Sequence, residues 1–185
     1  DSEPPVFRVV TAELQALGLK TTLEATMAAH KGLTLEQSRP LIEAQLGRPL
    51  PADWAPRLRQ RTTQALDEEL TAIPGAVAAV AAVMAAGMPN CVVSQSRRQR
   101  IELNLQQVGL AASFAGRIYS THDLGKPKPA PDIYLQAAAD FAVPPARITV
   151  IEDTVTGVTG GVAAGMRVLG YVADGVGGSL HAAGA

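Results

Sequence analysis

The sequence predicts an α/β fold in which a parallel β-sheet lies between layers of helices and an all-helical unit precedes it. Residues 1–72 show only helical patterns, whereas from residue 73 onward helical segments alternate with short apolar strands. Such alternation is typical of βαβ units, whose strands run parallel. We therefore expect a helical-bundle domain over residues 1–72 and an α/β core over residues 73–185.

The composition agrees with a soluble globular chain and excludes several classes of protein. The chain has 185 residues, 47% of them hydrophobic and 4% aromatic, and its formal net charge is −1. It has no surplus of basic residues, so generic nucleic-acid binding is not expected. A single cysteine, Cys91, excludes an internal disulfide and a multi-cysteine zinc site, and favours a reducing compartment such as the cytoplasm. No run approaches the roughly 18 apolar residues of a membrane span.

The first 72 residues show the apolar spacing of four helices joined by short loops, which is the pattern of a small bundle. Gly18 and Gly32 end the first two helices. Thr34 and Gln37 form the capping-box pattern that begins the third helix, and Pro40 is expected to kink or restart it. The expected helices cover residues 4–17, 22–30, 34 onward and 52–70.

The rest of the chain begins with an alanine-rich segment, residues 75–87, which is its most apolar stretch and is expected to form a buried helix. Helices then alternate with β-branched strands, so that helices cover both faces of the sheet in a three-layer arrangement. In such sheets, ligands bind at the carboxyl ends of the strands. The expected strands are 90–94, 117–120, 148–152 and 167–171, and the helices between them are 97–108, 130–141 and 154–164.

The first strand ends in Ser94, followed by Gln95 and Ser96 at the start of a helix. The serine hydroxyl, the backbone N–H groups of the next two residues and the positive end of the helix dipole together suit an anion. The same serines can also simply cap the helix, and both interpretations stay open here. A catalytic pair of Ser94 with His122 lacks an orienting carboxylate at a known spacing, so a solvated histidine is the simpler interpretation.

The loop before the next helix places Lys128 between two prolines. Prolines on both sides keep the backbone extended, so this lysine is held as a fixed charge that suits a phosphate or a carboxylate. The alternative is a turn in which Pro131 and Asp132 begin a helix. That alternative explains the prolines but not the lysine between them.

The third strand ends in two adjacent carboxylates, Glu152 and Asp153. Hard oxygen ligands at a strand end suit Mg²⁺, which binds one or two carboxylates and keeps several waters. Alternatively, Asp153 or Thr154 caps the following helix. The glycines at 157–165 lack the spacing of a dinucleotide-binding loop, so we expect them to permit close packing of the helix on the sheet.

One edge of the sheet would then hold a hydroxyl with free amides, a fixed lysine and a carboxylate pair. These are the groups that phosphoryl transfer requires. These segments strongly resemble the haloacid dehalogenase superfamily of phosphohydrolases, within it the subgroup of phosphoglycolate phosphatase and β-phosphoglucomutase. Residues 91–96, 128–134 and 151–166 are similar to three of the family's motifs. The resemblance implies a Rossmann-like α/β/α core and an inserted helical cap over residues 1–72.

The resemblance also implies roles for individual residues. The family uses the hydroxyl of the first strand and the lysine of the loop to bind the phosphoryl group, and the carboxylate pair to bind Mg²⁺. The cap supplies substrate contacts. The candidate site residues are therefore Ser94, Gln95 and Lys128 for phosphate, Glu152 and Asp153 for the metal, and Lys31 and Gly32 for substrate.

The family's first motif, D-x-D-G, is followed a few residues later by an Asp-Ser-Glu segment that residues 1–3 resemble. The nucleophilic aspartate, the general-acid aspartate and the central strand of the sheet are therefore expected upstream of residue 1. The last strand is expected beyond residue 185. On this interpretation residues 1–185 alone are inactive.

We therefore expect a Mg²⁺-dependent phosphatase that hydrolyses a small phosphorylated metabolite through an aspartyl-phosphate. One alternative is a truncated, non-catalytic member that binds a phosphorylated ligand or a partner. A sugar phosphomutase is less well supported, because Val6 and Leu35 stand where the mutases have histidine and arginine. The Glu152–Asp153 pair argues against the dehalogenase branch, which needs no metal.

Overall fold

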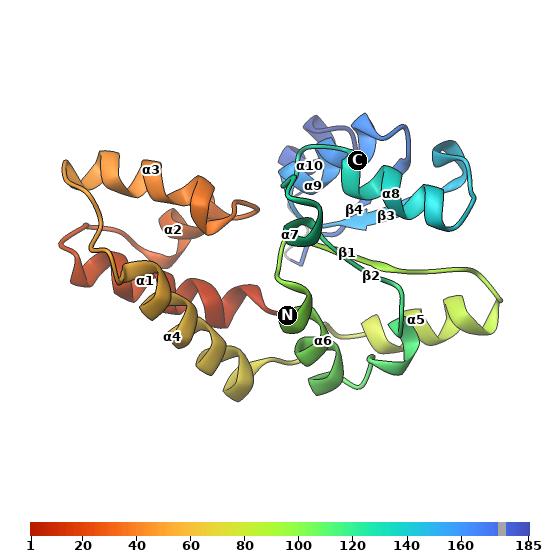
Figure 1. The fold of residues 1–185 in the computed structure, drawn as a ribbon, viewed down its shortest axis with the longest axis horizontal. Coiled ribbons are helices and arrows are strands. Elements are labelled where there is room, and N and C mark those ends of the chain that lie inside the picture. The colour runs from red at the N-terminus through yellow and green to blue at the C-terminus, as the bar shows by residue number, and fades with distance from the viewer. Residues whose placement is uncertain (174–176) are drawn as a thin grey trace. The chain divides into compact units, whose positions relative to one another are not determined.

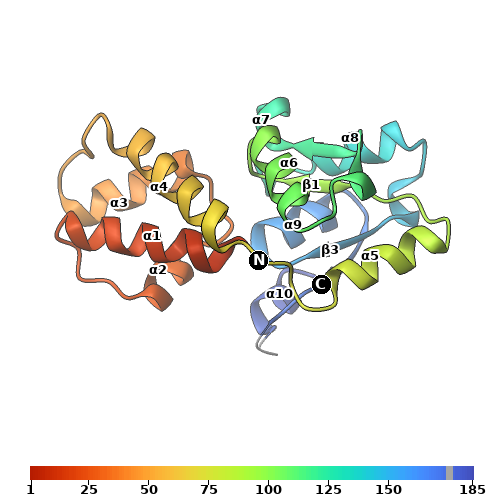
Figure 2. The same cartoon turned by 90° about the horizontal axis from the view of Figure 1, so that it is seen from below.

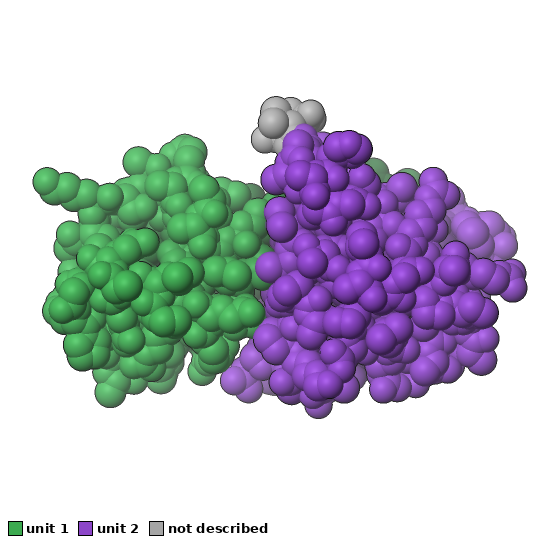
Figure 3. Space-filling model, turned by 90° about the horizontal axis from the view of Figure 1, so that it is seen from above, with its two compact units in different colours: residues 1–79, 104–110 green, residues 80–103, 111–185 purple. Residues whose placement is uncertain are grey.

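The computed structural model describes residues 1–173 and 177–185, and they form two compact units (Figures 1 and 3). The first unit contains residues 1–79 with 104–110, and the second contains residues 80–103 with 111–185. The predicted α/β fold with parallel strands and a helical unit is confirmed. The predicted domain boundary after residue 72 stays a prediction. In the described residues, no helix is both long and apolar enough to cross a membrane.

The first unit contains the four predicted helices, and α1 and α4 pack side by side (Figure 2). The capping box is confirmed: Gln37 N donates to Thr34 Oγ1 over 3.2 Å, and Thr34 N donates to Gln37 Oε1 over 2.8 Å. Pro40 lies inside the third helix without ending it. Of the two predicted effects, the restart is wrong and the kink stays a prediction. The helices are α1 Glu3–Ala16, α2 Leu23–His30, α3 Leu35–Leu46 and α4 Trp54–Glu69.

The core of the first unit is an apolar cluster contributed by α1, α3, α4 and the loop between α3 and α4. Its central side chain is Trp54, which is 1% exposed. Burial of large side chains from separate helices holds a bundle together, because isolated helices of this length are marginal in water. The cluster consists of Leu14, Ile42, Leu50, Trp54 and Leu58.

The strands lie in the second unit and form two parallel pairs. β1 pairs with β2, and β3 pairs with β4, in separate two-stranded sheets within the described residues. The strands are β1 Val92–Ser94, β2 Ile118–Ser120, β3 Thr149–Glu152 and β4 Arg167–Gly170. The other helices are α5 Ala76–Ala85, α6 Arg98–Gln107, α7 Thr121–Leu124, α8 Asp132–Asp140, α9 Val155–Ala163 and α10 Gly178–Ala182, with 3₁₀ turns at Ala112–Phe114 and Pro145–Arg147.

Both sheets pack against the same apolar cluster. Ile133 and Tyr134 of α8 form part of this cluster, and Val93 of β1 and Val150 of β3 both pack on it. The two sheets therefore pack on one apolar cluster, although β1 and β3 are not paired with each other. This arrangement places β1 and β3 on the same cluster.

The prediction of a buried helix over 75–87 is wrong with respect to burial. The segment does form α5, but none of its residues is buried, and Val77 and Met84 are 45% and 42% exposed. Alanine has the highest intrinsic helix propensity, so this segment can form a helix without being covered. The apolar composition of this segment therefore predicted the helix correctly and its burial incorrectly.

The glycines of α9 allow the helix to approach its neighbours, as predicted. A Cβ atom on Gly161 would lie 2.9 Å from Val168 Cγ2 on β4, and one on Gly160 would lie 2.8 Å from the Tyr134 ring. Contacts this short do not occur between real carbon atoms, so alanine at either position would force the packing apart.

His30, at the end of α2, predicts a dependence of stability on pH. Burial lowers the pKa of His30, because the charged imidazolium loses hydration. Between this lowered pKa and the unfolded value of about 6.5, the unfolded chain binds more protons, so the free energy of unfolding should fall as pH falls through this window. The contribution of neutral His30 to the free energy of unfolding is therefore present above the pKa of histidine in the unfolded chain and is lost as the pH falls.

Urea unfolding at pH 7.5 and pH 5.0 measures this effect. We expect the loss of stability in acid to shrink in His30→Gln and to persist in His122→Gln, since His122 is exposed. Equal acid losses in the wild type and His30→Gln would contradict the prediction.

Candidate active site

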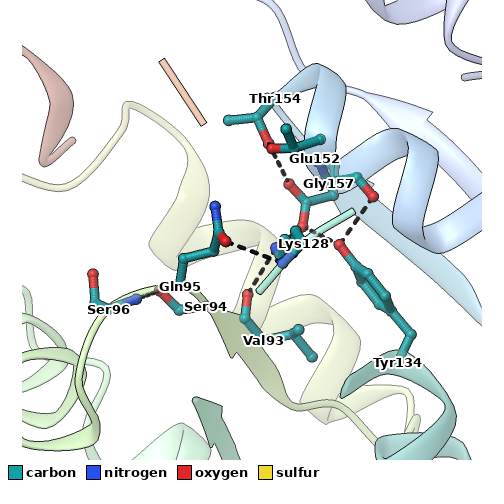
Figure 4. Close-up of polar contacts among 10 residues, drawn as sticks. Val93, Ser94, Gln95, Ser96, Lys128, Tyr134, Glu152, Thr154 and Gly157 are labelled. Carbon is teal, nitrogen blue, oxygen red and sulfur yellow. Dashed lines mark hydrogen bonds and ion pairs between the residues drawn. The ribbon is translucent and has the colours of Figure 1, made fainter. Parts of the chain in front are cut away.

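Three segments of the second unit bring polar side chains together at one place (Figure 4). β1 ends at Ser94, β3 ends at Glu152, and Lys128 lies in the loop before α8. Because parallel strands direct their carboxyl ends to the same edge, the side chains that follow them can meet there. The cluster formed by Lys128, Glu152 and Tyr134 is called the lysine cluster below.

Lys128 links the two sheets through its charged end. Its side chain is 6% exposed and forms an ion pair with the carboxylate of Glu152 on β3. Its Nζ also donates to the backbone oxygen of Val93 on β1 over 3.4 Å, and lies 5.2 Å from the centre of the Tyr134 ring. Lys126, in contrast, is exposed and pairs with Asp132. Lys128 is therefore held in place, as its flanking prolines suggested.

The backbone of Lys128 is fixed as well. Its N–H donates to the side-chain oxygen Oε1 of Gln95, over 3.0 Å. Gln95 thus joins the end of β1 to the lysine loop through its side chain. Its backbone N–H as a phosphate donor stays a prediction.

Glu152 accepts from several donors. The Tyr134 hydroxyl lies 2.7 Å from Glu152 Oε1, the oxygen that Lys128 also contacts, and 3.0 Å from the backbone oxygen of Gly157. Thr154 Oγ1 lies 3.4 Å from the other carboxylate oxygen. Burial raises the pKa of Tyr134, and the adjacent carboxylate raises it further, so the hydroxyl keeps its proton and acts as a donor.

Glycine is required where α9 begins beside this carboxylate. A Cβ atom on Gly157 would lie 2.0 Å from Glu152 Oε2. The Gly157 N–H donates to Thr154 Oγ1 over 3.1 Å, so Thr154 caps α9. Of the two capping alternatives, Thr154 is confirmed, and Asp153 does not serve as the cap.

Ser94 is half-buried, and its hydroxyl accepts from the N–H of Ser96 over 3.1 Å. This bond lies in the loop before α6, which begins at Arg98, so Ser94 does not cap that helix and the capping alternative is wrong for it. The hydroxyl proton of Ser94 remains to be donated elsewhere. Ser120 of β2 holds the same loop, because its hydroxyl donates to the Ser96 oxygen over 2.7 Å. His122 is exposed, and its backbone N–H, not its ring, contacts Ser120.

The two carboxylates at the end of β3 have different surroundings. Glu152 accepts from Lys128 and Tyr134 at Oε1 and from Thr154 at Oε2. The half-buried Asp153 is the member of the pair that better suits Mg²⁺, which binds through one or two carboxylates with water completing its shell. Among residues 1–173 and 177–185, no group of three or more His, Cys, Asp or Glu side chains could hold a metal. A metal bound here would thus take at most this pair from the described residues.

The two candidate substrate residues belong to the first unit. Lys31 Nζ forms an ion pair with Glu3, 2.8 Å apart, and Gly32 has a left-handed φ of 78°. Their role in substrate binding stays a prediction.

Comparison with known proteins identifies the family of this chain. Residues 4–165 match the family model of haloacid dehalogenase-like hydrolases. The 6-phosphogluconate phosphatase of Escherichia coli K12 is 27% identical over 175 residues, covering 94% of this chain and 78% of that protein. Several other curated phosphatases are matched over about half of their length, 46% to 57%.

Two solved structures are similar over nearly the whole chain. A haloacid dehalogenase-like protein of unknown function from Agrobacterium tumefaciens has a TM-score of 0.87 at 32% identity, covering 100% of this chain and 85% of that one. A hydrolase of the same family from Deinococcus radiodurans, solved with bound phosphate and sodium, has a TM-score of 0.79 at 32% identity, covering 99% and 82%. The chain belongs to the haloacid dehalogenase-like hydrolase family, and its curated relatives include phosphatases.

Removal of the Tyr134 hydroxyl tests the lysine cluster. Tyr134→Phe keeps the ring and deletes one donor to a buried carboxylate, so we expect the free energy of unfolding to fall by about 1.5–3 kcal/mol. Tyr119→Phe is the matched control: its hydroxyl bonds to the exposed Asp140, so its loss should cost less than about 1 kcal/mol. Urea unfolding measures the free energy of unfolding of both variants. Equal losses of this free energy would show that the bond to Glu152 contributes no more to stability than the bond to Asp140.

Proposed function

We propose that this chain is part of a Mg²⁺-dependent phosphatase that hydrolyses a small phosphorylated metabolite. The observation that carries the proposal is the buried Lys128 ammonium, which contacts the ends of both β1 and β3, with Ser94 and Asp153 following those strands. A fixed cation, a hydroxyl and a carboxylate pair are the groups that bind and neutralise a phosphoryl group. Relatives named as phosphatases support the same reaction.

The proposed roles follow from the contacts. The Ser94 hydroxyl donates to a phosphoryl oxygen, and Lys128 places its positive charge beside that group. Tyr134 and Gln95 act indirectly, since the first holds Glu152 and the second holds the lysine loop. Glu152 and Asp153 would hold Mg²⁺, which when bound neutralises negative charge on the phosphoryl oxygens.

We propose that the nucleophile lies on a strand outside residues 1–185 that pairs between β1 and β3. The separation of these strands into two sheets over one cluster supports this proposal. So does Asn90, two residues before β1, whose side-chain amide nitrogen and oxygen are both buried without a partner. Neighbouring strands lie about 4.8 Å apart, so a single strand inserted here requires β1 and β3 to be separated by about twice that distance.

The proposed reaction has two steps. A carboxylate oxygen of the aspartate attacks phosphorus, the ester P–O bond breaks, and the leaving alcohol takes a proton from the second aspartate of the D-x-D motif. Water then attacks the aspartyl-phosphate and gives a proton to the second aspartate, and release of inorganic phosphate restores the carboxylate of the first. Residues 1–185 alone would lack the nucleophile and are expected to be inactive.

Hydrolysis is favoured over sugar-phosphate transfer by two side chains of the first unit. Val6 and Leu35 line a cavity there and offer no hydrogen-bonding group to a sugar hydroxyl. Side chains with hydrogen-bonding groups would build a second phosphate site there, and simple hydrolysis does not require one.

Hydrolysis of p-nitrophenyl phosphate by the complete polypeptide, with and without Mg²⁺, tests the proposal. Asp153→Asn should lower Mg²⁺-dependent turnover by on the order of a hundredfold or more and weaken Mg²⁺ binding in calorimetry. Asp132→Asn is the control, because Asp132 pairs with Lys126 outside the lysine cluster, and its turnover should be unchanged.

Unchanged turnover in Asp153→Asn would overturn the metal assignment. Phosphate binding without any hydrolysis by the complete polypeptide would instead favour the non-catalytic alternative.

A further inference from the structure

A cleft of about 320 Å³ lies beside β2 in the second unit. All residues of β2 line it, together with side chains from the start of α6, from α7 and from α8. Its apolar surface comes from Ile118, Leu124 and Ile133. Among the described residues, no member of β1 or of the lysine cluster lines it, so the cleft lies on the side of β2 away from β1.

This side of β2 is an unpaired strand edge. β1 is the only strand that pairs with β2 in the described part of the chain. Val92 N donates to the Arg117 oxygen over 3.0 Å, and in a parallel pair alternate residues bond to the same neighbour. Tyr119 therefore also faces β1, whereas the N–H and C=O of Ile118 and the N–H of Ser120 point toward the cleft. Such an edge can pair with an added extended chain.

The cleft presents a cation and an anion that a ligand can contact. Arg98 Nε donates to Asp123 over 2.7 Å, which leaves the two Nη groups of this half-exposed arginine for a further acceptor. Asp140 is exposed and accepts from Gln136 Nε2 over 2.7 Å and from the Tyr119 hydroxyl. Burial and this carboxylate raise the pKa of Tyr119 to about 12, so its hydroxyl keeps its proton. Both donors to Asp140 are neutral and do not balance its charge.

The two charged groups lie at opposite ends of the cleft. α6 follows the carboxyl end of β1, so Arg98, its first residue, lies at the carboxyl ends of the strands. α8 leads from that edge back toward the amino end of β3, so Asp140, its last residue, lies at the amino ends. The unpaired edge of β2 runs between them.

We propose that this cleft binds a short extended peptide with free termini, which pairs parallel to β2 with its ammonium at Asp140 and its carboxylate at Arg98. β2 has three residues, and a strand rises about 3.3 Å per residue, so a tripeptide of about 10 Å matches it. The proposal does not depend on the phosphatase activity, because the cleft contains no member of the lysine cluster.

The charges and the strand edge together select this ligand class. A simple anion would meet Arg98 alone, beside the carboxylate of Asp123, and a simple amine would meet Asp140 alone. A linear zwitterion without amide groups would satisfy both charges and leave the Ile118 N–H and C=O unpaired. A peptide supplies both charges and the backbone groups between them.

Titration of the ¹⁵N-labelled complete polypeptide with trialanine tests the proposal. The amide peaks of Ile118 and Ser120 should shift saturably and gain protection from hydrogen exchange. N-acetyl-trialanine and trialanine amide each lack one terminal charge and should bind about two- to fivefold more weakly. 8-Aminooctanoate has the same number of bonds between its charged groups but no internal amides, and should bind about tenfold more weakly. No saturable shift with trialanine, or equal affinity for 8-aminooctanoate or for either capped peptide, would overturn the proposal.

Matched variants test the orientation of the peptide. Asp140→Asn should weaken binding of trialanine about two- to fivefold and leave binding of N-acetyl-trialanine unchanged, because that peptide has no ammonium. Asp132→Asn, on the same helix and outside the cleft, should change neither. Arg98→Gln should likewise weaken trialanine but not trialanine amide, with the exposed Arg97→Gln as its control. Equal losses for the capped and uncapped peptides in Asp140→Asn would overturn the proposal, and this isosteric variant decides if Arg98→Gln fails to fold by circular dichroism.

Discussion

The buried ion pair between Lys128 and Glu152 is the interaction on which the site depends. Both side chains are less than 10% exposed, so each charge needs the other and further hydrogen bonds to offset its lost hydration. The Tyr134 hydroxyl and the Val93 oxygen supply those bonds. Apolar side chains of similar volume stabilise a fold as well as a buried ion pair does, so stability gives no reason to keep these charges here. The proposed binding of a phosphoryl group at the strand ends would give such a reason.

The same pair constrains the elements around it. α9 can begin beside Glu152 only because residue 157 has no side chain, and it lies close to Tyr134 only because residue 160 has none. Gln95 ties the lysine loop to the end of β1, so the position of the ammonium depends on three separate segments. A glycine pattern that superficially resembles a nucleotide-binding loop is thus explained by packing around a carboxylate.

Local signals in the sequence predicted the local features of the structure. The capping box of Thr34 and the helical spacing of the first unit depend on residues a few positions apart, and both were predicted. The bond from Tyr134 to Glu152 joins residues 18 positions apart, and that from Ser120 to Ser96 spans 24, so no local pattern could reveal them. The exposure of α5 was missed for a related reason, because composition says nothing about which segment covers a helix.

The buried polar groups without partners separate into two cases with different physical causes. Asn90 precedes β1, where one strand edge is unpaired, and an additional strand would offer backbone partners to both its amide atoms. Trp54 and His30 belong to the first unit, whereas that strand would pair with β1 and β3 of the second. A backbone strand cannot serve both places. The unpaired ring nitrogens of Trp54 and His30 are therefore not accounted for by that strand.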